Sequence, residues 1–250
     1  MNPTLTLFPG PTALALAAAL AGAALLSGCT PAPPGTEIHD PYEAQNRAVH
    51  AENKRLDTAV FGGPGRESGE PGPFLKGLSN VGSNLRAPRY ALNGILQADP
   101  EIAVANTFRF LINSTFGLAG LFDPATALGI AERPTDFGAT LARWGVPEGA
   151  YLELPVLGPS TERDAAGRVA DLALDPVYWY LGLPDALGAL ALQSAGNIES
   201  RRRFAGTYES ILYDSADSYA QARLLYLQNR RYDLGQEEEV FDPFEDPYAE

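Results

Sequence analysis

The sequence predicts an all-α protein with little or no sheet, and three observations support this prediction. Apolar residues recur every three or four positions in several long stretches, which is the spacing of one side of a helix. Residues that favour a helix start precede several of these stretches, and Gly or Pro follows them. Only residues 151–156 alternate in the manner of a strand, and this segment is short.

The composition argues against several classes of protein. The net charge of −13 disfavours nucleic acid as a partner. A single Cys leaves no intramolecular disulfide, and the only two His, His39 and His50, lie early in the chain. All but two of the 18 basic residues are Arg, which suits phosphate or carboxylate, although an Arg-rich genome gives the same count. We expect no catalytic residue, no metal site and no cofactor.

Residues 1–28 are expected to be a lipoprotein signal peptide that is removed. Ala and Leu fill almost all of 13–26, an apolar run too short for a permanent membrane span. The run ends in Leu26-Ser-Gly-Cys29, which resembles the bacterial lipobox; this implies cleavage before Cys29 and a diacylglycerol on its thiol. The alternative is an ordinary signal peptide with a chance Cys. The sequence also departs from the usual signal-peptide pattern, because no Lys or Arg precedes the apolar run. Residues 29–39 are then a Pro-rich, lipidated tether.

A helical domain is expected over 40–235, and it begins with two helical segments. The first follows Asp40-Pro41 and has a thin apolar face; His50 within it is expected on the solvent side or at a cap. The second covers 74–97, and Pro88 is expected to divide it, because proline disrupts a helix interior.

The segment from Ile102 to Phe122 is the most apolar part of the predicted domain. Its 21 residues contain one charge, so length and polarity alone would allow a membrane span. Asn106, Arg109 and Asn113, however, are three and four residues apart and form one polar stripe on a helix. We expect this stripe to contact a channel or a headgroup. The alternative is that Arg109 pairs with a carboxylate of a neighbouring helix.

The second half of the chain continues the helical pattern. Helices are expected over 137–144 and from Thr161 onward, followed by an aromatic cluster at 178–180 that suits a membrane–water boundary or a core. No Pro occurs from 185 to 232, which predicts one long amphipathic helix with three consecutive Arg from Arg201 and with Gly196 and Gly206 as the places where it could bend. Residues 236–250 hold seven acids and no base, and they are expected to be a disordered tail.

Several motifs in this order resemble those of the MlaA (VacJ) family. The similarity covers residues 40 to about 234. The lipobox before this region is a second, independent point of resemblance. The motifs are Asp40-Pro-Tyr-Glu43 with Asn46-Arg47, Leu92-Asn93…Leu96-Gln97-x-Asp99-Pro100, Thr107-Phe-Arg109-Phe…Asn113, Phe137-Gly-x-Thr140…Trp144-Gly-Val146, Tyr151-x-x-Leu154-Pro155…Gly158-Pro-Ser160…Arg163-Asp164, and Ser215-x-Asp217-Ser-Tyr219.

The resemblance implies a flat, membrane-embedded assembly of amphipathic helices around a central channel. It implies no enzymatic reaction. It implies a lipoprotein of the outer membrane, on the periplasmic side, that removes mislocalised phospholipid from the outer leaflet and passes it to a soluble periplasmic carrier. A trimeric porin is the further partner implied. The alternative is a structural lipoprotein that tethers the envelope without lipid passage; no heptad or peptidoglycan-binding pattern supports it.

The resemblance also implies a glycine-containing hairpin loop next to the channel. In this sequence the loop resembles residues 145–149, with Gly145, Pro147 and Gly149 as its marked positions. Pro147 and Glu148 replace residues that are often Gly and aromatic in relatives. Proline restricts the backbone, so we expect this loop to be stiffer than the corresponding loop of its relatives.

Overall fold

The computed structural model describes residues 38–62, 72–181 and 183–236. The predicted signal peptide, the lipidation site Cys29, most of the tether and the acidic tail beyond residue 236 lie outside the described residues.

Helices make up most of the described chain, and the prediction of an all-α protein with little sheet is confirmed. The first helices are α2 (Glu43–Phe61), α3 (Pro73–Leu96), α4 (Pro100–Thr115), α5 (Pro124–Ala127) and α6 (Phe137–Arg143). After two strands follow α7 (Glu162–Leu174), α8 (Pro176–Tyr180), α9 (Leu183–Arg203), α10 (Ala205–Glu209), the π-helical turn η1 (Ser210–Asp214) and α11 (Ser218–Asp233).

The two strands form one antiparallel hairpin. Strand β1 (Tyr151–Leu154) pairs with β2 (Gly158–Thr161) in a register that places Tyr151 opposite Thr161. The three residues between the strands turn through Val156, whose φ is 67°. The alternating segment at 151–156 therefore becomes one arm of a small hairpin.

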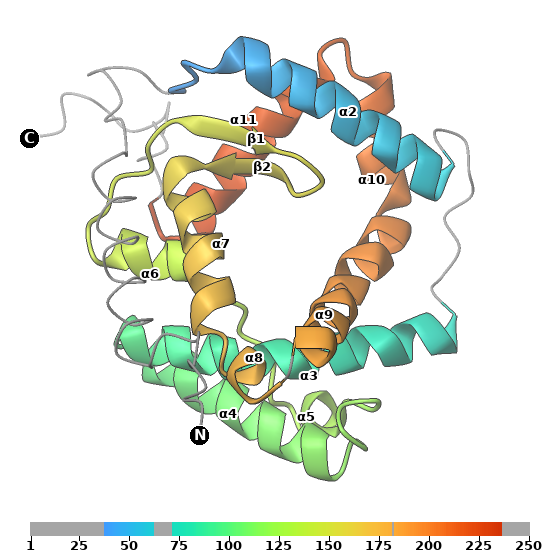
Figure 1. The fold of residues 1–250 in the computed structure, drawn as a ribbon, viewed down its shortest axis with the longest axis vertical. Coiled ribbons are helices and arrows are strands. Elements are labelled where there is room, and N and C mark those ends of the chain that lie inside the picture. Colours follow the sequence, from blue (N-terminus) through green and yellow to red (C-terminus); the bar gives the residue numbers. More distant parts are fainter. Residues whose placement is uncertain (1–37, 63–71, 182, 237–250) are drawn as a thin grey trace, which may run out of the picture.

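The helices are arranged as a ring. In Figure 1, α2, α9, α3 and α7 follow one another around a common centre, and the hairpin completes the circle between α7 and α2. Helices α4 and α5 lie below α3 in this view, away from the centre. The ring agrees with the flat assembly that the family resemblance implies.

Short polar side chains fix where many helices begin. Five side chains each cap a helix by accepting a hydrogen bond from the backbone N–H three residues ahead, within the first turn: Asp99, Asp123, Asp136, Thr161 and Asp217. Such caps satisfy donors that the helix itself leaves open, and each stabilises its helix by about 1 kcal/mol. These residues are the start signals that the sequence contains.

The predicted division of α3 at Pro88 is wrong, because the helix runs through it. Proline costs about 3 kcal/mol in a helix interior. Close packing offsets this cost: a Cβ atom added to Gly82 would lie 2.1 Å from the Leu192 carbonyl oxygen, and one added to Gly94 would lie 2.6 Å from the Ala103 nitrogen. The backbone of α3 is therefore held against α9 and α4 on both sides of Pro88.

The predicted long C-terminal helix is also wrong, because it is interrupted twice. The chain leaves α9 at Phe204 and breaks again between η1 and α11. At the second break Asp217 caps α11 and its carboxylate accepts two hydrogen bonds from Arg47. A local cap and a long-range ion pair together outweigh helical continuity.

No helix among the described residues is long and apolar enough to cross a membrane. The segment that invited this interpretation ends its helix at Thr115 and then turns back. Leu118, Ala119 and Gly120 all have positive φ there, which only a tight turn requires.

Candidate functional site

Polar side chains occupy the interior of the described chain. The largest side chains that are less than 2% exposed include a single aromatic one, Tyr151, and otherwise consist of polar or charged groups. They are Arg163, Tyr151, Asn93, Asn106, Thr140, Thr161, Asp175 and Ser160. A small aromatic core of Tyr151, Tyr219 and Leu227 joins the hairpin to α11. Water-soluble domains of this size normally bury large aliphatic side chains instead.

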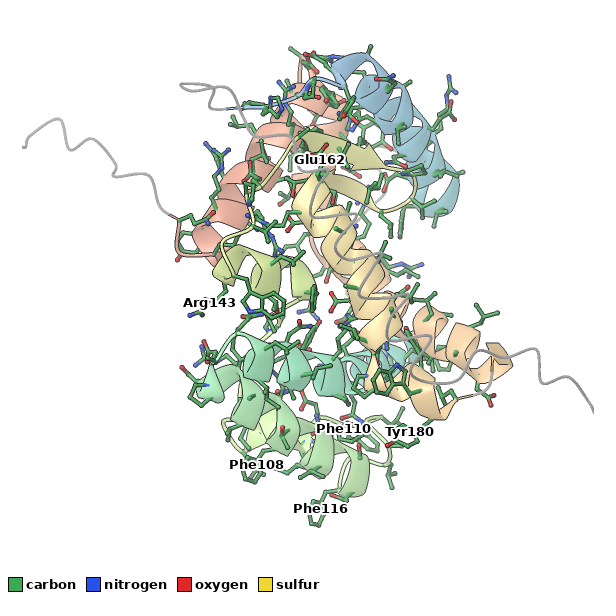
Figure 2. The ribbon with its side chains drawn as sticks, turned by 60° about the vertical axis from the view of Figure 1, so that its left-hand side comes forward. Phe108, Phe110, Phe116, Arg143, Glu162 and Tyr180 are labelled. Atoms are coloured by element: carbon green, nitrogen blue, oxygen red, sulfur yellow. The ribbon has the colours of Figure 1, made fainter. Side chains whose placement is uncertain are left out.

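Large apolar side chains lie on the surface, with the strongest concentration on α4 and the turn after it. We call this surface the α4 patch; it consists of Val104, Phe108, Leu111, Phe116, Leu118, Leu121 and Phe122. Phe116 is 80% exposed. Figure 2 shows Phe108 and Phe116 projecting from the lower edge of the molecule. A contiguous apolar patch of this kind marks a surface that contacts lipid or another protein.

The predicted stripe of Asn106, Arg109 and Asn113 lies on the opposite, buried side of α4. All three residues are at most 4% exposed. Asn106 donates to the carbonyl of Arg133, and Asn113 donates to Asp123 while accepting from the backbone N–H of Ala125. The stripe therefore fastens the segment 123–133 to α4.

Arg109 makes the carboxylate pair that the sequence left open as an alternative. Its Nη2 atom lies 2.9 Å from Asp123 Oδ2, and its Nη1 atom donates to Thr126 and to the Ile130 carbonyl. Burial raises the pKa of Asp123, but hydrogen bonds from Thr126, Arg109 and Asn113 outweigh it and hold this pKa below its usual value. A contact of Arg109 with a lipid headgroup stays a prediction.

The loop at 145–149 connects α6 to β1, and the strand hairpin follows it. Gly145 and Gly149 have φ values of 86° and 75°, which suit glycine. Glu148 pairs with Arg231 at 3.0 Å, and its carbonyl accepts a hydrogen bond from the backbone of Arg163. The contacts of Glu148, next to Pro147, hold the loop to α7 and α11. A contact of this loop with a channel stays a prediction.

An ionic cluster joins α6, α7 and α11. Arg230 lies 2.7 Å from Asp136 and 2.8 Å from Asp164, and Tyr226 donates to Asp164. Burial raises the pKa of Asp164, but Arg230 and Tyr226 outweigh it and hold this pKa below its usual value. A polar cavity of about 220 Å³ lies beside the cluster. The Arg163-Asp164 motif was the only sign of it in the sequence.

The expectation that His50 faces solvent is wrong. Its side chain is buried, with Nδ1 3.3 Å from a Glu153 carboxylate oxygen and Nε2 3.1 Å from the Ser218 hydroxyl. Helix α2 packs directly on β1 at this point, because Asn46 bonds to the backbone of Tyr151 and Glu153. The buried side of α2 therefore carries the polar residues Asn46 and His50, and not its thin apolar face.

The side chains of the aromatic cluster at 178–180, and those of the three consecutive Arg from Arg201, differ in their exposure. Tyr180 is 90% exposed and Trp179 is also exposed, whereas Tyr178 turns inward and donates to Gln193. In the Arg run, Arg201 is buried in a two-bond pair with Asp57, so only its neighbours remain solvated.

The fold and its residue distribution define a class of protein: a ring of helices with a polar interior and an apolar outer patch. The chain belongs to the MlaA lipoprotein family, whose model matches residues 38–233. It is 33% identical over 249 residues to the intermembrane phospholipid transport system lipoprotein MlaA of Shigella flexneri, covering 95% of this chain and 94% of that one. An uncharacterised protein of Rickettsia typhi is 33% identical over 200 residues, covering 75% of this chain and 74% of the relative.

A solved structure agrees with the fold. It comes from work on the structural basis for maintenance of bacterial outer membrane lipid asymmetry. It matches with a TM-score of 0.63 and 29% identity, over 78% of this chain and 98% of that chain. The prediction of family membership is confirmed.

Proposed function

We propose that this protein removes mislocalised phospholipid from the outer leaflet of the outer membrane and passes it to a soluble periplasmic carrier. The related Shigella protein is named as a lipoprotein of an intermembrane phospholipid transport system, which supports the substrate class. The protein acts as a transporter and carries out no enzymatic reaction. A trimeric porin is its neighbour in the membrane.

The observation that carries this proposal is the inverted distribution of polarity. Side chains such as Asn106 and Arg109 are buried, whereas Phe108 and Phe116 on the same helix segment are exposed. In water this arrangement is unfavourable, at roughly 25 cal/mol for each Å² of apolar surface left exposed. In a bilayer the α4 patch contacts acyl chains and the cost disappears. The α4 patch is therefore the membrane-embedded surface.

The anchor follows from the sequence. Diacylglycerol on Cys29 places the protein on the periplasmic side of the outer membrane, and several acyl chains on one residue hold far better than one. Exposed Trp179 and Tyr180 suit the boundary between acyl chains and water, because each ring has an apolar body and a polar tip.

The lipid passes through the centre of the ring in this proposal. The centre is bordered by α3, α7, α9 and the hairpin, which belong to different parts of the sequence (Figure 1). Asn106, Arg109 and Asn113 fasten the segment 123–133 to α4, on the side of α3 that faces away from the centre (Figure 1). The loop with Gly145, Pro147 and Gly149 directly precedes the hairpin.

The experiment is to label phospholipid in the outer leaflet of a strain that lacks the gene. We expect surface phospholipid to accumulate, wild type to reverse this, and Cys29→Ala to fail despite a normal protein level. Phe108→Ser should also fail, whereas Leu56→Ser, an exposed apolar position on α2, is the matched control. A normal leaflet distribution in the deletion strain would contradict the proposal and favour a structural tether.

A further inference from the structure

An apolar groove lies at the corner between α3 and α4. Its volume is about 340 Å³, and its accessible lining is almost wholly apolar. The lining residues are Gly94, Ile95, Ala98, Asp99, Pro100, Ala103 and Val104. The close approach of Gly94 to Ala103 forms the corner, while Ile95 and Val104 are 66% and 53% exposed. The groove therefore has small residues at the corner and large apolar side chains at its edges.

One end of the groove continues into the α4 patch. Val104, Phe108 and Leu111 are four and three residues apart, so they lie on one side of α4. All three are exposed. An extended apolar ligand in the groove would therefore remain in contact with apolar surface as it leaves.

An ion pair borders the groove. Asp99 belongs to the lining, and Arg143 Nη2 lies 3.6 Å from its carboxylate. Arg143 is on the surface, and the neighbouring Trp144 donates its indole N–H to the Leu96 carbonyl while its ring stays exposed. Figure 2 shows Arg143 well separated from Phe108. The groove thus has a nearly apolar lining and an ion pair, with one charge of each sign, at its margin.

We propose that the groove binds one zwitterionic glycerophospholipid of the surrounding leaflet. One acyl chain fills the groove, the phosphate contacts Arg143, and the ammonium group lies beside Asp99. This inference rests on the proposed membrane contact of the α4 patch. The site is separate from the transport path, because α4 lies on the side of α3 that faces away from the ring centre (Figure 1).

The chemistry of the lining favours a lipid over a peptide. A peptide segment needs partners for its backbone N–H and C=O groups, and leaving them unpaired is costly. The lining offers almost no polar surface for this purpose. An acyl chain needs no hydrogen bond, while the partly exposed pair of Arg143 and Asp99 beside the groove matches the two charges of a zwitterionic headgroup.

The test uses the full-length, acylated protein in vesicles of phosphatidylethanolamine and phosphatidylglycerol. A phosphatidylethanolamine with a photoreactive acyl chain is crosslinked, and labelled peptides are mapped by mass spectrometry. Ala103→Phe fills the groove, and Leu111→Phe adds bulk to the α4 patch outside it as a control. Arg143→Gln removes the phosphate contact, and Arg202→Gln, an exposed Arg on α9, is its control. Helicity and the thermal midpoint confirm that each variant is folded.

We expect labelling at residues 94–103 to fall at least fivefold in Ala103→Phe and Arg143→Gln and to stay unchanged in both controls. A probe with a phosphatidylglycerol headgroup should label these residues several times less. Equal labelling in wild type and both test variants would overturn the inference, as would crosslinks from this groove to a protein in cell membranes. Labelling of the α4 patch without the groove refutes only this site, whereas no labelling of either refutes the proposed membrane surface.

Discussion

Replacing Arg230 by methionine tests the role of the buried ionic cluster. The variant keeps much of the side-chain volume but leaves Asp164 without its closest cation. The Asp164 side chain is 5% exposed, so its carboxylate stays largely desolvated when the cation is removed, although the adjoining cavity gives water some access. Removing one partner of a buried ion pair typically costs about 3–5 kcal/mol.

The lower end of that range applies here, because Asp164 retains other partners. Arg163 Nε remains 3.6 Å away, and the Tyr226 hydroxyl still donates a hydrogen bond. Asp136, the second partner of Arg230, is 40% exposed and adds little. At about 3 kcal/mol, and with about 2–4 °C per kcal/mol for a chain of this size, the thermal midpoint should fall by about 6–12 °C.

The assay is thermal unfolding of the purified protein in mild detergent, followed by circular dichroism. Arg202→Met is the matched control, because Arg202 is exposed and makes no ion pair within 4.0 Å among the described residues. Adding Asp164→Asn to Arg230→Met should recover part of the loss, since the neutral amide can still accept from Tyr226. A midpoint within 2 °C of the control would refute the reasoning.

Three further predictions concern packing, the polar stripe and pH. Gly82→Leu should prevent α3 from approaching α9 and should abolish folded protein, because a Cβ there meets the Leu192 carbonyl; Gly206→Ala, with open space around it, should be neutral in the same expression and melting assay. Arg109→Met should lower the free energy of unfolding by about 2–4 kcal/mol, less than a fully buried pair because Asp123 is partly exposed; denaturation with an unchanged midpoint would contradict this. Folding lowers the pKa values of Asp123 and Asp164, so both carboxylates stabilise the folded state. This stabilisation is complete above the unfolded pKa near 4 and is lost as the pH falls through the folded pKa values. Thermal melting between pH 7 and pH 2 should show the loss, and it should be smaller in Arg230→Met.

The starts of several helices and the family membership could be predicted from the sequence, because each depends on short motifs of neighbouring residues. Asp136 and Thr161 each stand directly before a helical run and cap the helix that follows. The continuity of α3 could not be predicted in this way. It depends on two close contacts: Gly82 meets the backbone of Leu192, more than 100 residues away, and Gly94 meets that of Ala103, about ten residues away. No local sequence pattern indicates such contacts.

The candidate site shows the same division. The spacing of Asn106, Arg109 and Asn113 predicted a polar side of α4, and the structure contains it. What that side contacts was not predictable, because Asp123 is a neighbour only after the chain reverses through three residues with positive φ. The burial of His50 was missed for a similar reason: its partner Glu153 lies 103 residues away.

The polar interior has a thermodynamic consequence. The heat-capacity change of unfolding grows with the apolar surface that becomes hydrated and shrinks with the polar surface that does so. Here unfolding hydrates groups such as Arg163, Asn93 and Thr140, while the apolar α4 patch lies outside the fold and adds little as long as lipid or detergent covers it in both states. The stability curve should therefore be flatter than that of a water-soluble domain of equal length. A protein built in this way keeps nearly the same margin of stability in cold and in warm surroundings.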